Sequence, residues 1–480
     1  MAPIAACTIA SYNYLALARI LAESYREHHP GAQVFVCIVD RPHDAVRLAD
    51  FPFVPVFADE LDIPGFASLA FRCDVLELNT AVKPFFLRAL RDRFRLERVL
   101  YFDPDILVLD SLAPLAAELD GAELVVTPHL ATPLADEQAD IEQGILAAGV
   151  YNLGFLGIRL NDETAAFLSW WARRLHRFGV KDVARHLFVD QKWIDFAPAF
   201  LARVAVVRDP AYNVAWWNLS QRPPQRAGSG WQVLGRRLGF FHFSGIDFAD
   251  PTRVSRHAAR LSLDSGSDVA ALFAAYRERV AVAGHATFSR IPYGFSHFTD
   301  TDIPLTTEVR RTLRRIDPDG RRWPDPFATD AADTFLAWLL EPIEGAGGVL
   351  NRAVLALWEE RAELVSAFPL VLDEHLPYYV SWLAQYGQSS GGLDPIFLAS
   401  IRATAREPGR RAIPPLDPHL ASGLDHAARI IQRIDLARPG AMLAWLNDPL
   451  PGTARPRPVL TRLTLALHRA RPDLQGRFPD

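Results

Sequence analysis

Apolar and polar positions along the first 290 residues follow two periods. Short apolar runs at 4–11, 33–40, 98–103, 124–128, 150–158, 204–208 and 238–244 are typical of buried strands, and amphipathic stretches at 14–28, 79–93 and 162–178 are typical of helices. A strand–helix–strand order favours parallel pairing, with helices on both faces of the sheet. The pattern therefore predicts an α/β domain built on a mostly parallel sheet.

The pattern changes near residue 290. Strand signals fade there, and proline-rich breaks separate helical stretches at 305–315, 331–340, 350–368 and 395–407. The segment 350–369 aligns without a gap to 460–479, and its leucines fall at helical spacing, which favours a packing or partner-contact face. We predict an α/β domain at 1–290, a linker with short helices at 291–345, and a mainly helical region with this repeat at 346–480.

Composition narrows the functional classes. The chain has 480 residues, of which half are hydrophobic and 22% are charged, and its net charge of −5 leaves no electrostatic footprint for nucleic acid. Cys7, Cys37 and Cys73 are not spaced as a CxxC pair, and each lies in or near an apolar segment, as reduced core thiols do. The residues Met1–Cys7 lack the basic and long apolar segments that are typical of a signal peptide, and no run of 18 apolar residues occurs in the sequence. These features predict a cytoplasmic protein and leave peripheral association with the inner membrane open.

Two carboxylates follow the apolar run at 98–102. Asp103 and Asp105 flank Pro104, and residues at positions i and i+2 of an extended segment point to the same side. Two hard oxygen ligands at the end of a strand suit a divalent cation and a phosphorylated substrate, although Asp-Pro-Asp is also good turn chemistry. His242, in an aromatic strand that ends in Ser-Gly, is the candidate third ligand, and the set fits Mn²⁺ or Mg²⁺.

Other polar residues sit at positions where a small ligand could be contacted. Asp190 and Gln191 place a carboxylate beside an amide, and Asn152 precedes two glycines inside a strand. Helix capping and turn chemistry are the alternative roles for these residues. Trp216 and Trp217 offer either a stacking platform for a sugar acceptor or ordinary core packing.

The order of these segments resembles the GT-A nucleotide-sugar glycosyltransferases, and most of all glycosyltransferase family 8. The resemblance covers roughly the first 250 residues and rests on Thr8–Tyr14, Lys83-Pro-Phe-Phe-Leu, Val99–Asp105, Tyr151–Phe155, Asp190-Gln191 and His242-Phe-Ser-Gly245. It implies a Rossmann-like GT-A domain at 1–290 that is catalytic, followed by the helical region. It also implies a metal-dependent transfer of sugar from a nucleoside diphosphate sugar, with UDP favoured, to a saccharide, lipid-linked or protein acceptor in bacterial glycan synthesis.

The same resemblance assigns roles residue by residue. Asp103, Asp105 and His242 would hold the cation, while Asn152 and Asp190 would hold sugar hydroxyls and Gln191 would lie near the anomeric carbon. The remaining donor contacts would come from Ala10, Ser11, Tyr12, Lys83 and Gly245. The chain lacks the lysine that usually follows the His-x-x-Gly motif, so another cation, such as Lys83, Arg253 or His257, would meet the diphosphate charge.

A neutral Gln191 is a weak nucleophile, which favours a retaining reaction in which the departing phosphate deprotonates the acceptor. An inverting reaction would need a carboxylate base such as Asp190 or Asp247. Two other functions stay open. The segment around Asp103 and Asp105 also matches the first motif of haloacid-dehalogenase-like phosphatases, and a nonenzymatic adaptor could retain a degenerate GT-A domain.

Overall fold

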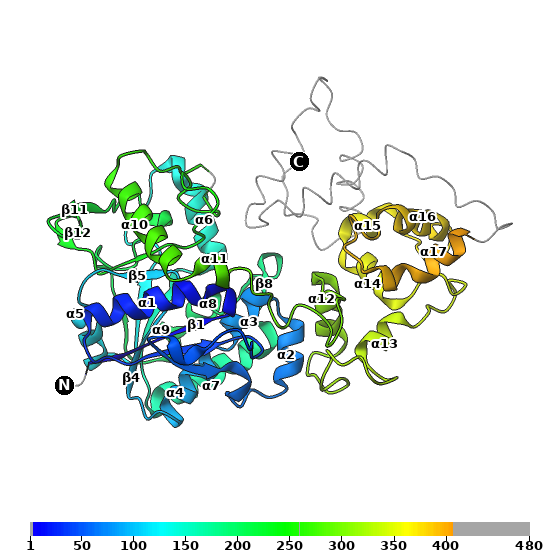
Figure 1. The fold of residues 1–480 in the computed structure, drawn as a ribbon, viewed down its shortest axis with the longest axis horizontal. Coiled ribbons are helices and arrows are strands. Elements are labelled where there is room, and N and C mark those ends of the chain that lie inside the picture. Colours follow the sequence, from blue (N-terminus) through cyan, green and yellow to red (C-terminus); the bar gives the residue numbers. More distant parts are fainter. Residues whose placement is uncertain (1–2, 259, 407–480) are drawn as a thin grey trace, which may run out of the picture. The chain divides into compact units, whose positions relative to one another are not determined.

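The structure is a computed structural model that describes residues 3–258 and 260–406. Its contacts divide the chain into two units, the first formed by 1–66 and 75–295 and the second by 67–74 together with the chain from 296 onward. Figure 1 shows the elements of each unit in sequence colours. The second copy of the predicted repeat, at 460–479, lies outside the described residues.

The first unit is built on a seven-stranded sheet in the order β10-β6-β7-β4-β1-β2-β3. Its strands are β1 (Ala5–Ala10), β2 (Val34–Ile38), β3 (Val54–Phe57), β4 (Arg98–Phe102), β6 (Leu124–Pro128), β7 (Tyr151–Arg159) and β10 (Val204–Val206). All neighbours pair in parallel except β7, which runs antiparallel to both β4 and β6. The predicted α/β class with a mixed, mostly parallel sheet is confirmed.

Continuous burial explains the apolar runs of the central strands. Every residue of β1 and β2 is buried, as expected for parallel strands that carry helices on both faces. Helix α1 (Leu15–His28) packs its buried face into the core that includes β1 and β2, and α4 (Lys83–Asp92) packs against α7 (Asp162–Phe178). The remaining helices of this unit are α3 (Val75–Ala81), α5 (Ala113–Ala117), α6 (Ala139–Ala148), α8 (Gln191–Ile194), α9 (Ala197–Phe200), α10 (Asp268–Val282) and α11 (His285–Phe288).

Two local predictions differ from the structure. The helix expected at 79–93 is divided between α3 and α4, because Pro84 occupies the first turn of α4, where a missing backbone N–H costs nothing. The strand expected at 238–244 is the short β14 (Phe240–His242), which lies outside the main sheet and pairs antiparallel with β5 (Ile106–Val108). The other short strands are β8 (Lys181–Asp182), β9 (Leu187–Phe188), β11 (Gln225–Ala227), β12 (Gly230–Val233) and β13 (Arg236–Arg237).

The pairing of β5 with β14 sets where His242 points. On β14, Phe241 joins a second core with Leu272 and Phe273 of α10, and Phe243, two residues further on, stacks on Tyr276 with ring centroids 3.8 Å apart. Because side chains alternate along a strand, His242 faces the other way. The aromatic residues on either side of it therefore fix its direction.

The described part of the second unit is helical, as predicted. It contains α12 (Thr307–Ile316), α13 (Phe335–Leu340), α14 (Arg352–Glu360), α15 (Ala362–Ala367), α16 (Leu376–Tyr386) and α17 (Ala399–Arg406), together with most of α2 (Phe66–Arg72). The Arg310 guanidinium donates to the carbonyls of Ala70, Phe71 and Cys73 at the end of α2, where carbonyls lack helical partners. The helix expected at 350–368 is broken at Arg361, whose backbone is extended.

Two further observations bear on the sequence analysis. The three cysteines are buried and make no disulfide, in agreement with the prediction of core thiols. Across residues 3–258 and 260–406, no helix is both long and apolar enough to cross a bilayer.

Candidate functional site

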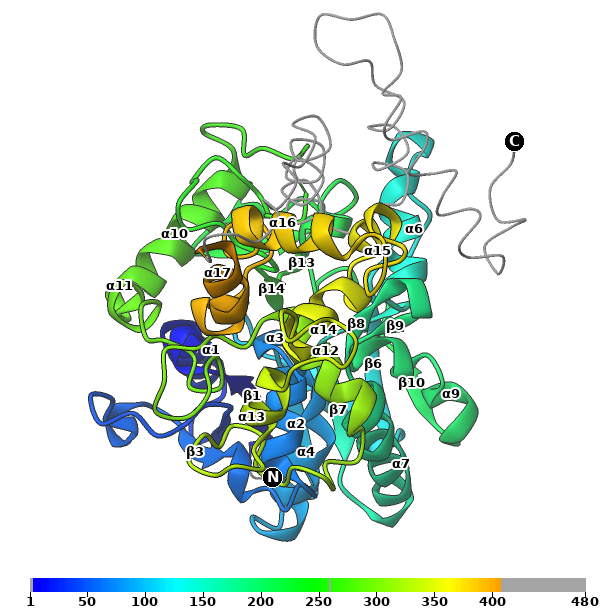
Figure 2. The same cartoon turned by 90° about the vertical axis from the view of Figure 1, so that its right-hand side faces the viewer.

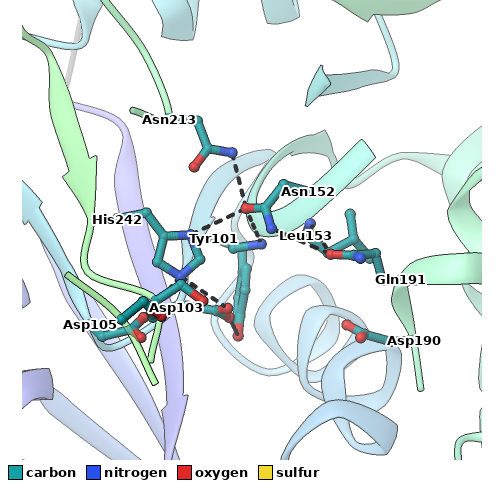
Figure 3. A network of polar contacts seen from close by, with 12 residues as sticks. Tyr101, Asp103, Asp105, Asn152, Leu153, Asp190, Gln191, Asn213 and His242 are labelled. Atoms are coloured by element: carbon teal, nitrogen blue, oxygen red, sulfur yellow. Dashed lines mark hydrogen bonds and ion pairs between the residues drawn. The ribbon is translucent and has the colours of Figure 1, made fainter. Parts of the chain in front are cut away.

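Asp103, Asp105 and His242 converge at one point beside the main sheet (Figure 3). The His242 Nε2 atom lies 3.1 Å from Asp105 Oδ1 and 3.9 Å from Asp103 Oδ2, and one ligand atom from each residue lies within 4.8 Å of the others. The imidazole is 3% exposed and the two carboxylates are 16% and 34% exposed, so the cluster opens toward solvent on its acidic side. Two carboxylates and one imidazole suit Mn²⁺ or Mg²⁺, whose remaining positions substrate oxygens could fill.

Backbone hydrogen bonds place the two carboxylates. The Asp103 N–H donates to the Gly154 carbonyl at 2.8 Å, which extends the pairing of β4 with β7 by one residue. The chain then turns, with the Ile106 N–H donating to the Asp103 carbonyl, and the Phe243 N–H donates to the Asp105 carbonyl at 2.9 Å. Asp103 and Asp105 are thus anchored to different sheets on either side of the turn. The Asp-Pro-Asp segment is both the turn and the source of the two carboxylates.

A buried amide fixes the tautomer of the neutral His242 ring. Asn152 Oδ1 accepts hydrogen bonds from the Gly154 N–H at 3.1 Å and from Asn213 Nδ2 at 3.0 Å, and it lies 3.2 Å from His242 Nδ1. The backbone N–H can only donate, so this atom of Asn152 is the oxygen, and an oxygen requires a proton on Nδ1. The neutral ring therefore carries its lone pair on Nε2, which faces Asp103 and Asp105 as a metal ligand needs.

The amide network continues behind Asn152. The Nδ2 atom of Asn152 lies 3.3 Å from His129 Nε2, while His129 Nδ1 lies 3.1 Å from the Val150 carbonyl. Burial lowers the pKa of His129 to about 4, so its ring is neutral and accepts from Asn152. Sequence reasoning missed His129 and Asn213, because each is a lone polar residue in a segment without a motif. Only the fold brings them together.

Gly154 makes room for the imidazole. A Cβ atom at this position would lie 2.3 Å from His242 Cε1 and 2.8 Å from Asn152 Oδ1, closer than atoms can approach. The glycine in the Asn-Leu-Gly segment of β7 is therefore required by the ring of His242 rather than by a ligand. This strand supplies both the hydrogen bond and the space that hold His242.

Charges around the cluster shift its proton affinities. Burial raises the pKa of Asp103, against the opposing effects of Lys83 and His242, and the Tyr101 hydroxyl donates to Asp103 Oδ1 at 2.7 Å. Burial by itself would lower the pKa of His242, but the neighbouring carboxylates of Asp105 and Asp103 outweigh it and the net pKa is raised. Protons and a cation therefore compete for the same atoms.

Lys83, Asp190 and Gln191 are held inside the wall of the site. The Lys83 Nζ atom lies 2.5 Å from Asp190 Oδ2 and 4.1 Å from the centre of the Tyr101 ring, and both members of the ion pair are almost completely buried. Gln191 Oε1 accepts from the Leu153 N–H at 3.1 Å, and its Nε2 donates to the Ala148 carbonyl at 3.1 Å. The structure thus brings these three predicted residues beside Asn152 and satisfies them internally.

The predicted nucleotide contacts lie at the end of β1. Ala10 is its last residue, Ser11 Oγ donates to Asn13 Oδ1 at 2.6 Å, and the Tyr12 N–H donates to Asp40 Oδ2 at 3.3 Å. Because β1 and β4 are parallel neighbours, this segment and Asp103 occupy the same edge of the sheet. Asp40, which follows β2, is a further residue that the sequence analysis did not single out.

The loop after β14 brings in a cation that the sequence analysis overlooked. Gly245 has φ +70°, and its carbonyl accepts from the Arg256 N–H at 2.8 Å. The Arg256 side chain is exposed, and its positive charge lies near Tyr14, whose pKa is raised first by burial and then by the nearby Asp105. Of the cations considered from sequence, Lys83 pairs with Asp190, Arg253 lies 3.4 Å from Asp247, and His257 lies against Gly245, where a Cβ atom would come within 2.5 Å of its Cδ2. Arg256 and His257 are therefore exposed basic residues of the loop that is bonded to Gly245, three residues after His242.

The two adjacent tryptophans differ in their surroundings. Trp217 is 4% exposed and packs edge-on against the His242 ring, with centroids 5.4 Å apart and planes at 90°. Trp216 is only partly buried. Trp217 therefore belongs to the packing that holds His242, and Trp216 is the tryptophan with surface left for contact with a ligand.

Comparisons with known proteins find relatives for about half of the chain. No family model matches. The chain is 28% identical over 248 residues to the uncharacterized protein YfnF of Bacillus subtilis (strain 168), covering 50% of this chain and 80% of that protein. It is 23% identical over 244 residues to YfnD of the same organism, covering 50% and 76%.

Solved structures of glycosyltransferases are among those to which the chain is similar. The galactosyltransferase LgtC, solved with donor and acceptor sugar analogs, has a TM-score of 0.35 and 18% identity, covering 57% of this chain and 95% of that one. The glycosyltransferase GlyE of Streptococcus pneumoniae TIGR4 also has a TM-score of 0.35, with 13% identity, covering 62% and 67%. Similarity at this distance does not establish an activity, so the function rests on the site itself.

Proposed function

We propose that this chain is a metal-dependent glycosyltransferase that moves a sugar from a nucleoside diphosphate sugar, with UDP favoured, to a saccharide, lipid-linked or protein acceptor in bacterial glycan synthesis. The observation that carries the proposal is the cluster of Asp103, Asp105 and His242, with the end of β1 on the same sheet edge. A cation site and a base-binding segment at one edge suit the two ends of a nucleoside diphosphate.

Asp103, Asp105 and His242 would hold Mn²⁺ or Mg²⁺, which neutralises negative charge on a diphosphate leaving group when bound. The residues fit such an ion because the His242 tautomer already presents its Nε2 lone pair to the cluster. The Tyr101 hydroxyl fixes one oxygen of Asp103. The chain's own hydrogen bonds therefore prepare the three ligands before the cation arrives.

Charge on the leaving diphosphate also needs a cation from the protein. Arg256 lies in a loop that is attached to the strand of His242, since its N–H bonds to Gly245 and the Ser255 hydroxyl donates to the Ser244 carbonyl at 2.7 Å. We infer that its exposed guanidinium takes the part of the absent lysine and donates to phosphate oxygens.

The wall of the site favours retention. Gln191 uses both ends of its amide to bind backbone, and Asp190 is paired with Lys83, so neither side chain is placed as a free nucleophile or base. The departing phosphate would then accept the acceptor proton on the same face of the sugar ring. We therefore infer that Asn152, Asp190 and Gln191 hold the wall of the site in place, and that the sugar hydroxyls contact this wall.

The test is release of nucleoside diphosphate from UDP-, GDP- and dTDP-sugars, and of CMP from CMP-sugars, by the purified full chain in Mn²⁺, in Mg²⁺ and in a chelator. We expect turnover of one donor family with the metal and a loss of roughly 100-fold in D105N. D110N is the matched control, because Asp110 is a surface carboxylate paired with Arg237. Metal-dependent hydrolysis of a phosphomonoester that D103N abolishes, with no turnover of any nucleotide sugar, would favour the phosphatase instead. No turnover of either substrate class by the folded chain would favour the adaptor.

A further inference from the structure

Aromatic side chains gather on the surface of the first unit, on α7, α8 and α9. The aromatic patch consists of Trp170, Phe178, Trp193, Phe196 and Phe200. Phe196 and Phe200 stack with planes 12° apart and are 49% and 53% exposed. Figure 2 shows α9, which carries Phe200, projecting at the edge of the unit on the same side as α7.

The patch is continuous rather than a set of isolated residues. Trp170 lies 4.8 Å from Phe200 and 6.1 Å from Trp193 between ring centroids, and Trp193 stacks on Phe178 at 6.1 Å. A contiguous aromatic surface on a soluble unit is costly to leave in water and commonly marks a contact with a partner or a membrane. The charged residues around the aromatic patch indicate which of the two, a partner or a membrane, it would contact.

Three arginines border the patch. Arg173, Arg174 and Arg177 follow Trp170 on α7 by three, four and seven residues, which places them on the same side of the helix. The Arg177 guanidinium carbon lies 5.5 Å from the centre of the Phe178 ring. Within the described residues none of the three makes an ion pair with a carboxylate, and the nearby Asp195 is paired with Lys192 at 3.2 Å. The border is therefore positive on a chain whose net charge is −5.

We propose that the aromatic patch and these three arginines bind the surface of an anionic bilayer. Tryptophan and phenylalanine rings fit the boundary between headgroups and acyl chains, and arginines beside them attract anionic headgroups. An acidic protein would meet the same arginines, but the two most exposed residues, Phe196 and Phe200, are apolar rings that suit the acyl-chain boundary of a bilayer. The combination favours a lipid surface.

The patch is built into the wall of the candidate site. Helix α8 begins with Gln191 and carries Trp193 two residues later, and the indole of Trp171, next to Trp170, donates to the Asp190 carbonyl at 3.4 Å. A bilayer on the patch would therefore lie next to the elements that form the wall. This arrangement would suit a lipid-linked acceptor, but the membrane contact stands without the proposed activity, and its assay needs neither donor nor metal.

The test is cosedimentation of the full chain with vesicles of 70% phosphatidylcholine and 30% phosphatidylglycerol, and with vesicles of phosphatidylcholine alone, at 0.1 M and 0.5 M salt. We expect at least tenfold stronger partition to the anionic vesicles at low salt, and most of this preference lost at high salt. F196S/F200S and R173E/R177E should each weaken partition at least tenfold.

Matched variants on other surfaces separate the patch from general effects. V282S removes an apolar side chain that is 84% exposed at the end of α10, and R47E/R95E changes the net charge by as much as R173E/R177E does. Both should bind vesicles as the unaltered chain does. Equal partition of all variants, or no partition to either vesicle, would overturn the proposal. A change of oligomeric state in F196S/F200S without vesicle binding would assign the patch to a second copy of the chain instead.

Discussion

Replacing Asn152 by alanine tests the claim that a buried amide sets the tautomer of His242. The substitution removes the oxygen that accepts from Gly154, Asn213 and His242 over 3.0–3.2 Å. At about 1 kcal/mol for each of these three hydrogen bonds, the free energy of unfolding should fall by at least about 3 kcal/mol, since the longer bonds from Asn152 Nδ2 to His129 and Gln191 are lost as well. With no acceptor at Nδ1, the imidazole proton can move to Nε2, the atom that would bind the metal. Loss of a hydrogen bond to the other ring nitrogen of a metal-binding histidine lowers metal affinity roughly 10–100-fold.

Two measurements separate the effect on the ring from the effect on stability. Titration with Mn²⁺ gives the affinity, and nitrogen-15 NMR of the histidine rings gives the position of the proton. N218A is the matched control, because Asn218 is fully buried and also makes three hydrogen bonds, none of them to an imidazole. It should lose similar stability and keep its Mn²⁺ affinity within about threefold. A folded N152A with unaltered Mn²⁺ affinity and a protonated Nδ1 on His242 would refute the reasoning.

Three further results are expected. G154A should weaken Mn²⁺ binding at least about tenfold, because its Cβ would displace the His242 ring. G157A, on the same strand as Gly154, places its Cβ against the core side chains of Val125 and Leu100 and should leave Mn²⁺ binding unchanged. In donor titrations, R256A should raise the KM about tenfold by removing a charged hydrogen bond, whereas R253A, already paired with Asp247, should change it less than about twofold. Finally, the pKa values of His242 and Asp103 are raised, so protons should compete with Mn²⁺ already above the ordinary imidazole pKa of about 6.5. The affinity for Mn²⁺ should therefore fall as the pH drops from 8. An Mn²⁺ affinity that does not change between pH 8 and pH 6 would contradict this.

The sequence predicted the central sheet because its strands are buried on both faces. Continuous apolar runs such as β1 and β2 carry the signal of a parallel strand without any knowledge of their partners. The antiparallel direction of β7 could not be read in this way, since direction is set by how the chain returns to the sheet and not by the pattern within the strand. The break between α3 and α4 was readable from Pro84, but the apolar period across it favoured one helix.

The residues of the candidate site also differ in how far the sequence predicted them. Asp103 and Asp105 were predictable because they directly follow a buried strand, and they do converge with His242, but they flank a turn between β4 and β5 instead of sharing an extended segment. Arg256 and His129 were not predictable, since their places depend on backbone hydrogen bonds of loops and on contacts across the sheet. The roles proposed for Asn152 and Gln191 changed for a related reason. Sequence shows that a polar side chain is present and cannot show which of its atoms the fold has already satisfied.

The most direct test of the central claim is the affinity of UDP for the purified full chain, measured by calorimetry in Mn²⁺ and in a chelator. The account predicts binding at least about tenfold tighter with Mn²⁺, and no such difference in D105N, because the diphosphate and the cluster of Asp103, Asp105 and His242 would share the cation. UDP binding of equal strength with and without Mn²⁺, in a chain that binds the metal, would contradict it.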